Sequence, residues 1–415
     1  MRYNYRISQR SRTLRIDSTE LATRIAGDPF KEIVFRRRGG HHAYLVGGNL
    51  RDVILDRQSR DRDFAVEGSP EVLAGRIAAE TGGKMVILGK KLLYRIVLAD
   101  GSTLDFSRVS ESIESDLKLR DYTVNALGWS PEEGIIDPTN GLGDLERRIV
   151  RMTGRDNLRS DPVRIIRAYR LAAELGFTIE PETREALREL SAEVATSKSE
   201  RITLEFFRIL NLEEPSCILK LMLDDGVLSY IITFNNNMLG KQARVISTIC
   251  EIFDVLPLKQ KLRLSDIVSQ NLRYSGLLRL QSLLWNSSGT LLRLSSRILD
   301  DRRRLLTGEK IKKEAEKKGK KVRDILFDLL AALDGAAEDY FIIRGMQEFL
   351  PECERYRQII KKGLLSTGEI IECTGLDSGK ELGRLIEMMR RAEFYRKIND
   401  KYGAVQFLLE NLPRY

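Results

Sequence analysis

The sequence predicts an α+β fold, in which a strand-rich N-terminal head is followed by a long helical remainder. Between about residues 43 and 130, short segments with alternating apolar residues surround one longer segment with helical spacing at 69–82. After Pro138 this pattern ends, and residues 160–415 are rich in Leu, Ile, Arg, Lys and Glu with apolar residues at helical spacing. A mixed sheet with flanking helices, continued by helices alone, fits both observations.

Five segments of the head have the period-two pattern of strands. They are 43–46 (AYLV), 61–68 (DRDFAVEG), 84–88 (KMVIL), 92–101 (LLYRIVLADG) and 102–109 (STLDFSRV). The head ends in 130–145, where Pro, Gly, Asn and Asp gather as turn formers. We therefore expect an N-terminal extension (1–40), the head (41–145), a helical neck (146–212), a helical body (213–290) and a helical tail (291–415).

Charge and cysteine content limit the class of protein. Lys and Arg outnumber Asp and Glu by 69 to 60, and the net charge of +9 suits a polyanionic partner without identifying one. The four cysteines form no C-x-x-C pair, which speaks against a zinc site or a disulfide framework and favours a reducing cytoplasm. No apolar run approaches the ~18 residues that span a bilayer, so no membrane is expected. The basic N-terminus is no secretory signal, although an organelle transit peptide stays possible.

A pair of glycines marks the first candidate site. Gly47 and Gly48 follow the strand at 43–46 directly and precede a predicted helix that carries Arg51 and Asp52. Glycine lets the backbone approach a phosphate closely, and the N-terminus of a helix favours negative charge. An ordinary tight turn would have the same sequence, so the glycines alone do not decide.

Two aspartates begin the next strand. Residues i and i+2 of a strand project from the same face, so Asp61 and Asp63 lie together while Arg62 points away. A bound divalent cation would let both carboxylates stay ionised, and two such cations can drive an in-line displacement at phosphorus. Paired surface aspartates are the plain alternative. Asp105, in the strand at 102–109, either supports this metal site or faces solvent.

At this point the residues resemble a known family. Gly47-Gly48-x-x-Arg51-Asp52 with Asp61-x-Asp63 resembles the class II tRNA nucleotidyltransferases and bacterial poly(A) polymerases of the polymerase-β superfamily. Further matches follow in order at 116–126 (DLKLRDYTVNA, similar to D-L-x-R-R-D-F-T-I-N-A), 137–145 (a hinge motif), 160–167 (similar to E-D-x-x-R) and 200–205. The matches cover about residues 44 to 210, and the resemblance implies that the helical tail at 291–415 binds RNA.

The resemblance implies an enzyme that adds nucleotides without a template to the 3′ end of a tRNA or a tRNA-like RNA. It implies Mg²⁺ at Asp61 and Asp63, with Asp105 as a further catalytic residue. CTP, and possibly ATP, would supply the nucleotide, which the remaining candidate residues would bind. These are Gly47, Gly48 and Arg51 for the triphosphate, Asp52, Arg120, Asn125 and Asp121 (the last for the ribose), Asp161 and Arg164 for the base, and Arg167 for a phosphate.

The base-reading helix also has a physical argument. Asp161 suits the N-cap of a helix that starts at Pro162 and ends near Gly176, and residues 161 and 164 are neighbours on one face. A carboxylate acceptor beside a guanidinium donor matches the pairing edges of cytosine and adenine, whereas uracil and guanine present the reverse order. An N-cap with a surface salt bridge is the plain alternative.

The sequence departs from the family pattern at three places. Leu119 replaces the first arginine of the second motif, and Ser160 replaces the glutamate of E-D-x-x-R. Only fourteen residues separate Asp105 from Arg120. The resemblance associates such a short segment with members that add only CC, so we expect CC addition. Addition of A alone, of the whole CCA end or of poly(A) are alternatives, and a non-catalytic RNA-binding relative is the alternative outside the enzymes.

Overall fold

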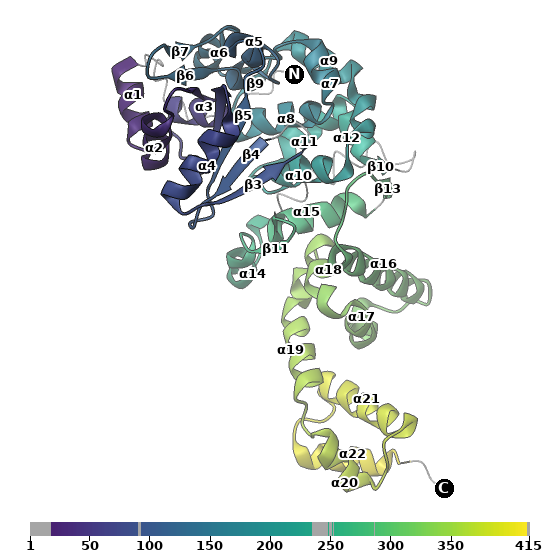
Figure 1. The fold of residues 1–415 in the computed structure, drawn as a ribbon. Helices are drawn as coiled ribbons and strands as arrows, with labels where there is room; N and C mark the ends of the chain where they lie inside the picture. The colour runs from purple at the N-terminus through teal and green to yellow at the C-terminus, as the bar shows by residue number, and fades with distance from the viewer. Residues whose placement is uncertain are drawn as a thin grey trace. The chain divides into compact units, whose positions relative to one another are not determined.

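The computed structural model describes residues 18–89, 93–234, 248, 251, 253–285 and 287–412 (Figure 1). Residues 1–17, for which a transit peptide was considered, lie outside this part of the chain. Two compact units form: unit 1 ends at Thr233 and adds 290–292, and unit 2 comprises the remainder. No helix in the described ranges is long and apolar enough to cross a membrane.

Unit 1 is built on a mixed sheet with the strand order β3-β4-β5-β2-β1-β6-β7. All neighbouring strands pair antiparallel except β2 and β5, which are parallel. The five strands expected from the sequence are present, and two further short ones extend the edge beyond β1. The strands are β1 (His42–Val46), β2 (Asp61–Glu67), β3 (Lys84–Leu88), β4 (Leu93–Val97), β5 (Thr103–Arg108), β6 (Gly128–Ser130) and β7 (Gly134–Ile136).

The two faces of the sheet are covered by different helices. On one face the stacked rings of Phe64 and Phe106 meet Phe35, whose helix α2 packs with α4 (Figure 1). On the other face, Tyr44, Val46 and Ala65 form a cluster with Ile113 and Leu117 of α5. Phe64 points to the first face and successive residues of a strand point to opposite faces, so Asp61 and Asp63 project on the α5 side of the sheet.

Two helices before the first strand were not foreseen in the segment expected to be an extension. Leu21, Ile25 and Val34 of α1 and α2 are buried. Asp28 caps α2 and also accepts a hydrogen bond from Arg62 Nε at 2.7 Å. This pair shows that Arg62 points away from the face that carries Asp61 and Asp63, as the strand period predicts.

The remaining elements of unit 1 are mainly helices. They are α1 (Ser18–Ala26), α2 (Pro29–Arg37), α3 (Gly48–Ile54), α4 (Pro70–Thr81), α5 (Ile113–Lys118), η1 (Thr123–Asn125), α6 (Gly141–Arg147), β8 (Ile149–Val150), α7 (Arg155–Ser160), α8 (Val163–Leu175), β9 (Thr178–Ile179), α9 (Pro181–Glu189), η2 (Ser191–Thr196), α10 (Ser199–Leu210), α11 (Ser216–Asp224) and α12 (Val227–Ile231). The short pair β8 and β9 interrupts the expected run of helices because the chain pairs locally beside α8.

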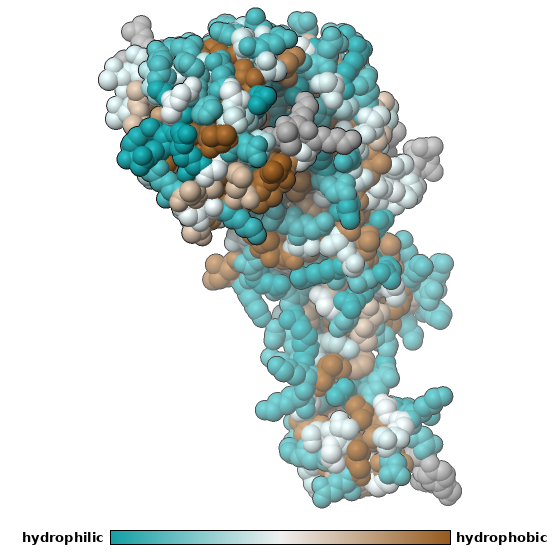
Figure 2. All heavy atoms as spheres, viewed as in Figure 1, coloured by the Kyte–Doolittle hydropathy of each residue, from teal (hydrophilic) through white to brown (hydrophobic). Residues whose placement is uncertain are grey.

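Unit 2 is helical apart from short strands, and β10 (Ile232–Phe234) and β13 (Ser287–Thr290) lie where the chain passes between the units. Its elements are α14 (Leu258–Arg263), β11 (Ile267–Ser269), β12 (Leu272–Arg273), α15 (Tyr274–Leu284), α16 (Ser296–Lys317), η4 (Val322–Ile325), α17 (Leu326–Leu333), η5 (Asp334–Ala336), α18 (Ala337–Ile343), η6 (Gln347–Phe349), α19 (Leu350–Lys361), α20 (Thr367–Thr374), α21 (Lys380–Phe394) and α22 (Lys401–Glu410). On the face shown in Figure 2, hydrophilic side chains cover most of the surface, with apolar groups between them, as is usual for a surface in contact with water.

Candidate active site

The glycine turn lies between β1 and α3. Gly47 has a φ of 74°, and its N–H donates to the carbonyl oxygen of Leu127 at 3.2 Å. A Cβ atom on Gly47 would lie 2.8 Å from Nη1 of Arg120, so a side chain here would be both strained and crowded. The turn therefore requires glycine at 47, and it brings the backbone close to Arg120 and Asp63.

Two residues after this turn are engaged within the protein. The guanidinium of Arg51 is buried and donates to Asn125 Oδ1 at 2.5 Å and to Asp52 Oδ1 at 2.8 Å. Asn49 donates from Nδ2 to the carbonyl oxygen of Asp61 at 2.8 Å. Arg51 thus acts in this structure as a link between α3 and η1, while Asn49 fixes the start of β2.

The two aspartates of β2 differ in their surroundings. Asp61 is exposed and accepts a hydrogen bond from Thr103 Oγ1 at 3.0 Å. Asp63 is more enclosed, and burial raises the pKa of its carboxyl group. The charge of Arg120 opposes this shift, but the carboxylates of Asp105 and Asp61 add to it, and the resulting pKa is about 6. Two carboxylates on one face, one of them resisting ionisation, favour a bound cation.

Asp105 lies beside this pair. The parallel register of β2 and β5 places Asp105 directly opposite Asp63. Its carboxylate, however, accepts two hydrogen bonds from Arg95 of β4, at 2.7 Å from Nε and 2.6 Å from Nη2. Asp105 is therefore already neutralised by a fork of N–H donors.

Asp61 and Asp63 remain as the cation ligands that this face can offer. No group of three or more His, Cys, Asp or Glu side chains converges as a metal site in the described residues. Mg²⁺ is usually held by one or two carboxylates, with water and substrate phosphates completing its six ligands. Asp63 on the wall of a cavity, with Asp61 on the same face of β2, fits that pattern.

A cavity of about 670 Å³ opens beside Asp63. Its walls include eight of the residues singled out from the sequence: Gly47, Gly48, Asp63, Arg120, Asp121, Asn125, Arg164 and Arg167. Five others had not been assigned to the site: Ser107, Arg108, Ser110, Asp116 and Leu119. Asp61, Asp105, Arg51, Asp52 and Asp161 do not line it.

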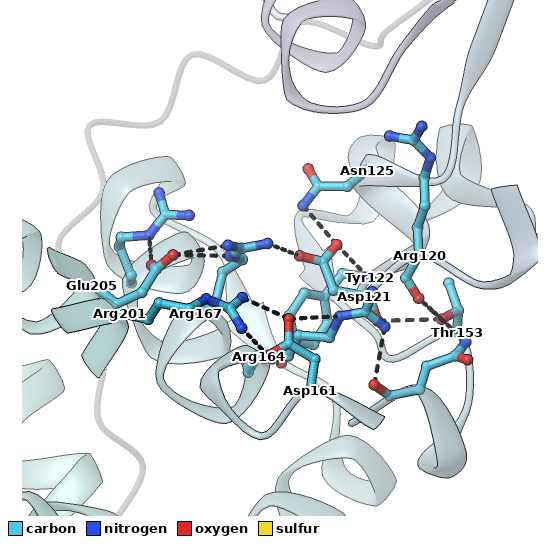
Figure 3. Close-up of polar contacts among 12 residues, drawn as sticks. Arg120, Asp121, Tyr122, Asn125, Thr153, Asp161, Arg164, Arg167, Arg201 and Glu205 are labelled. Carbon is cyan, nitrogen blue, oxygen red and sulfur yellow. Dashed lines mark hydrogen bonds and ion pairs between the residues drawn. The ribbon is translucent and has the colours of Figure 1, made fainter. Parts of the chain in front are cut away.

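Asp121 and Arg167, which line this cavity, belong to a chain of ion pairs that continues to Glu205 (Figure 3). Arg167 of α8 donates from Nη1 to Asp121 Oδ2 and from Nε to Glu205 Oε1 of α10, both at 3.0 Å. Asp121 is buried and also accepts from Asn125 Nδ2 at 3.0 Å. Burial alone would raise the pKa of Asp121, but the charge of Arg167, together with hydrogen bonds from Arg167, Asn125 and the N–H of Tyr122, lowers the pKa. Asp121 is thus held ionised.

The structure corrects the role expected of Asp161 at the start of α8. The helix begins at Val163, Pro162 takes the N-cap position, and the side chain of Asp161 makes no capping bond. Instead both carboxylate oxygens accept from the guanidinium of Arg201, each at 2.7 Å (Figure 3). Two charge-assisted hydrogen bonds outweigh the single bond of a cap. Gly176 ends the helix in a left-handed conformation, as predicted.

Arg164 lies beside Asp161 but is directed to backbone carbonyls. Its Nη1 donates to the oxygens of Leu119 at 3.1 Å and Asn157 at 2.9 Å, and its Nε is 3.8 Å from Asp161 Oδ2. The expected neighbours are thus together, although the carboxylate already has a partner. Arg201 was the residue missed here, and its place in the motif at 200–205 was the available signal.

The two substituted residues among the three departures from the family pattern lie in different surroundings. Leu119 lines the cavity and is 62% exposed. Ser160 is exposed and donates from Oγ to the carbonyl oxygen of Asn157 at 2.9 Å, outside the cavity wall. Leu119 therefore gives the cavity an apolar rim, whereas Ser160 only closes the last turn of α7.

Comparison with known proteins places these features in a family. Residues 43–151 match a family model described as "Poly A polymerase head domain", and residues 176–235 match one described as "Probable RNA and SrmB- binding site of polymerase A". The CC-adding tRNA nucleotidyltransferase of Geobacter sulfurreducens is 30% identical over 404 residues, which cover 90% of this chain and 92% of that protein.

Other relatives match over shorter lengths. The CC-adding tRNA nucleotidyltransferase of Synechocystis sp. is 40% identical over 193 residues, covering 45% of this chain and 46% of the relative. The A-adding tRNA nucleotidyltransferase of Deinococcus radiodurans is 38% identical over 156 residues, covering 38% of this chain and 36% of the relative. These alignments span about half or less of each relative.

Among solved structures, the CCA-adding enzyme of Thermotoga maritima in complex with tRNA has a similar fold. The TM-score is 0.73 at 19% identity, and the match covers 96% of this chain and 99% of the other. At this identity the likeness speaks for the fold alone.

Proposed function

Because the chain belongs to the tRNA nucleotidyltransferase family, we propose that it adds C residues to the 3′ end of a tRNA from CTP and stops after CC. Family membership rests on the relative that is similar along 90% of the chain. Relatives of this family differ in whether they add CC, A or CCA, so the number and kind of nucleotides added must come from the site.

The connection between β5 and α5 carries the proposal of CC addition. β5 ends at Arg108 and α5 begins at Ile113, so four residues, 109–112, join them. Ser112 caps α5 by accepting a hydrogen bond from the N–H of Ser115 at 3.2 Å. A change of specificity from C to the larger A requires the pocket to be reshaped, and gating loops do this elsewhere. This connection of four residues, one of which caps α5, is too short to reshape the pocket as a gating loop would.

In the proposed reaction the 3′-hydroxyl oxygen of the RNA attacks the α-phosphorus of CTP. The bond from that phosphorus to the bridging oxygen breaks, and pyrophosphate leaves. The glycine turn at 47–48 lets the triphosphate lie against the backbone, while Arg120 supplies positive charge on the cavity wall. Asp121, held ionised by Arg167, is placed to accept a hydrogen bond from the ribose.

Asp61 and Asp63 would hold Mg²⁺, with the nucleotide phosphates and water as further ligands. A cation there would neutralise charge that develops on the phosphate oxygens and lower the pKa of the attacking hydroxyl. Arg95 would hold the carboxylate of Asp105 at a fixed place opposite Asp63.

Base selection is assigned to Arg164 and Asp161. Cytosine offers a donor beside an acceptor, which an acceptor carboxylate and a donor guanidinium satisfy together. Burial disfavours the ionised form of Asp161, but the hydrogen bonds and charge of Arg201 lower its pKa and keep it an acceptor. Both side chains must turn partly from their present partners to reach the base.

One assay tests the proposal. Purified protein is given tRNA transcripts that end before CCA, after C and after CC, each with a single labelled nucleotide. We expect CTP incorporation on the first two transcripts and little ATP incorporation on the third. ATP addition to the CC-ending transcript at a rate comparable with CTP addition would overturn the CC assignment and leave the family assignment standing.

A further inference from the structure

A second charged cluster of unit 1 lies on α9, outside the cavity described above. Asp225, which follows α11, has a fully buried carboxylate. It accepts hydrogen bonds from Arg184 Nη2 at 2.7 Å, Arg188 Nε at 2.6 Å and Tyr169 Oη at 3.0 Å. One buried charge therefore fixes two arginines that are one helical turn apart.

Arg188 has N–H groups that do not donate to Asp225. An arginine carries five N–H donors, and Arg188 uses only Nε on Asp225, so both of its terminal amino groups have no protein partner within the described ranges. Its side chain is 50% exposed and that of Arg184 is 34% exposed. Two guanidinium groups balanced by one carboxylate leave a net positive charge at a preorganised place.

Both arginines line a hollow of about 390 Å³. It is lined by Ile179, Pro181, Arg184, Glu185 and Arg188, which lie on β9 and along one side of α9. A fork of N–H groups at the wall of an open hollow matches the geometry of a phosphate group, which accepts bidentate hydrogen bonds. The buried aspartate holds the fork in place and so lowers the entropy lost on binding.

We propose that Arg188, held with Arg184 by Asp225, is a contact for a backbone phosphate of the RNA substrate. The site lies in 176–235, the region that matches the model described as a probable RNA-binding site. The inference rests on the proposed function for the identity of the RNA, but it concerns binding and is separate from the chemistry at Asp63.

The hollow also holds a residue of opposite effect. Glu185 is exposed on the same wall, and its carboxylate would repel a phosphate. If RNA lies here, removal of this charge strengthens binding, whereas removal of the Arg188 charge weakens it. A purely structural role of the cluster has no reason to produce opposite signs.

The test measures the dissociation constant of a tRNA transcript lacking CCA as a function of salt for Arg188→Gln and Glu185→Gln. Arg188→Gln leaves Asp225 with Arg184 and Tyr169, so the fold is expected to hold. We expect about three- to tenfold weaker RNA binding and a salt slope smaller by about 1. Glu185→Gln should bind about twofold more tightly at low salt, and the KM for CTP should stay unchanged in both.

Arg37→Gln is the matched control, because Arg37 is 52% exposed and forms an ion pair with Glu80 in which Nε lies 2.7 Å from Oε2. The site would be refuted if Arg37→Gln weakened RNA binding as much as Arg188→Gln. It would also be refuted if the affinity of Arg188→Gln for RNA and its salt slope stayed within twofold of the unmodified chain. Inorganic phosphate offers the same oxygens, so its binding is measured by titration. Phosphate binding that Arg188→Gln removes without any change in RNA affinity would assign the site to a free anion instead. If the unmodified chain fails to incorporate CTP on saturating RNA, that result contradicts the proposed function and leaves this contact standing.

Discussion

The carboxylates on the two sides of the cavity differ in whether an arginine pairs with them. On the sheet side, among the described residues of unit 1, Asp61 accepts a side-chain hydrogen bond only from the hydroxyl of Thr103, and Asp63 accepts none. On the helical side, Asp121, Asp161 and Glu205 each accept bonds from an arginine. Asp61 and Asp63 thus lack a cationic hydrogen-bond partner, while the three carboxylates of the helical side are paired before any nucleotide binds.

This difference separates two tasks. A metal site benefits from carboxylates that nothing else neutralises, because their mutual repulsion adds to cation affinity. A base-reading site must hold its donors and acceptors in one arrangement, and buried ion pairs provide such an arrangement. The cost is that Asp161 and Arg164 must exchange partners when the base arrives.

The largest expected effect breaks the sheet side. Asp63→Ala should lower CTP incorporation by about a thousandfold or more, because it removes a proposed cation ligand. The free energy of unfolding should stay the same or rise, since an unpartnered enclosed carboxylate is lost. Single-turnover incorporation and urea denaturation measure the two effects. Activity within tenfold of the unmodified chain would exclude Asp63 as a ligand, and Asp100→Asn serves as the control.

The second prediction breaks the helical side. Arg167→Met should lower the free energy of unfolding of unit 1 by about 3 kcal/mol, because the buried carboxylates of Asp121 and Glu205 both lose a charged partner. Arg36→Met, which removes an exposed pair with Glu80, should cost at most about 1 kcal/mol. Trp129 reports unfolding of unit 1 if Trp285 is first replaced by Phe. Equal losses in the two variants would mean that the network adds nothing special.

A smaller effect is expected at the glycine turn. Gly47→Ala should cost about 1–2 kcal/mol of stability and raise the KM for CTP, owing to the positive φ and the approach to Arg120 Nη1. Gly48→Ala is the matched variant, because its Cβ would meet Arg51 Nη2 only at 3.4 Å. Urea denaturation and steady-state kinetics compare them. If Gly48→Ala proves the more damaging, the turn does not depend on Gly47 in this way.

The smallest expected effect sharpens the account of base reading. Arg164→Ala should reduce the preference for CTP over UTP by about tenfold, since it removes the donor that rejects the uracil edge. Competition between the two nucleotides on one tRNA transcript gives the ratio directly. An unchanged ratio would move base selection to other residues, with Arg201 first among them.

The sequence allowed predictions where the deciding pattern is local. The projection of Asp61 and Asp63 from one face follows from strand period alone, and the glycine turn follows from its place after an apolar strand. The α+β fold and the family are confirmed. The helices α1 and α2 were missed although Asp28 and Pro29 form an N-terminal helix signal at the start of α2.

What could not be predicted depends on partners distant in sequence. The pairing of β2 with β5 decides that Asp105 lies opposite Asp63, and β4 decides that Arg95 neutralises it. Likewise Arg201 is 40 residues from Asp161, and its fork displaces the local capping bond that sequence rules favour. The domain boundaries and the assignments of the site residues stay predictions.

The chain of charges from Asp121 through Arg167 to Glu205 also bears on modularity. A fragment that stopped at the predicted end of the head, residue 145, would contain Asp121 without the arginine that neutralises it, because Arg167 lies on α8. Such a fragment would lack the guanidinium that pairs with Asp121 and holds it ionised. The catalytic head is therefore not a transplantable module, and exchange of parts between enzymes of this kind should succeed only when the segment up to α10 travels with it.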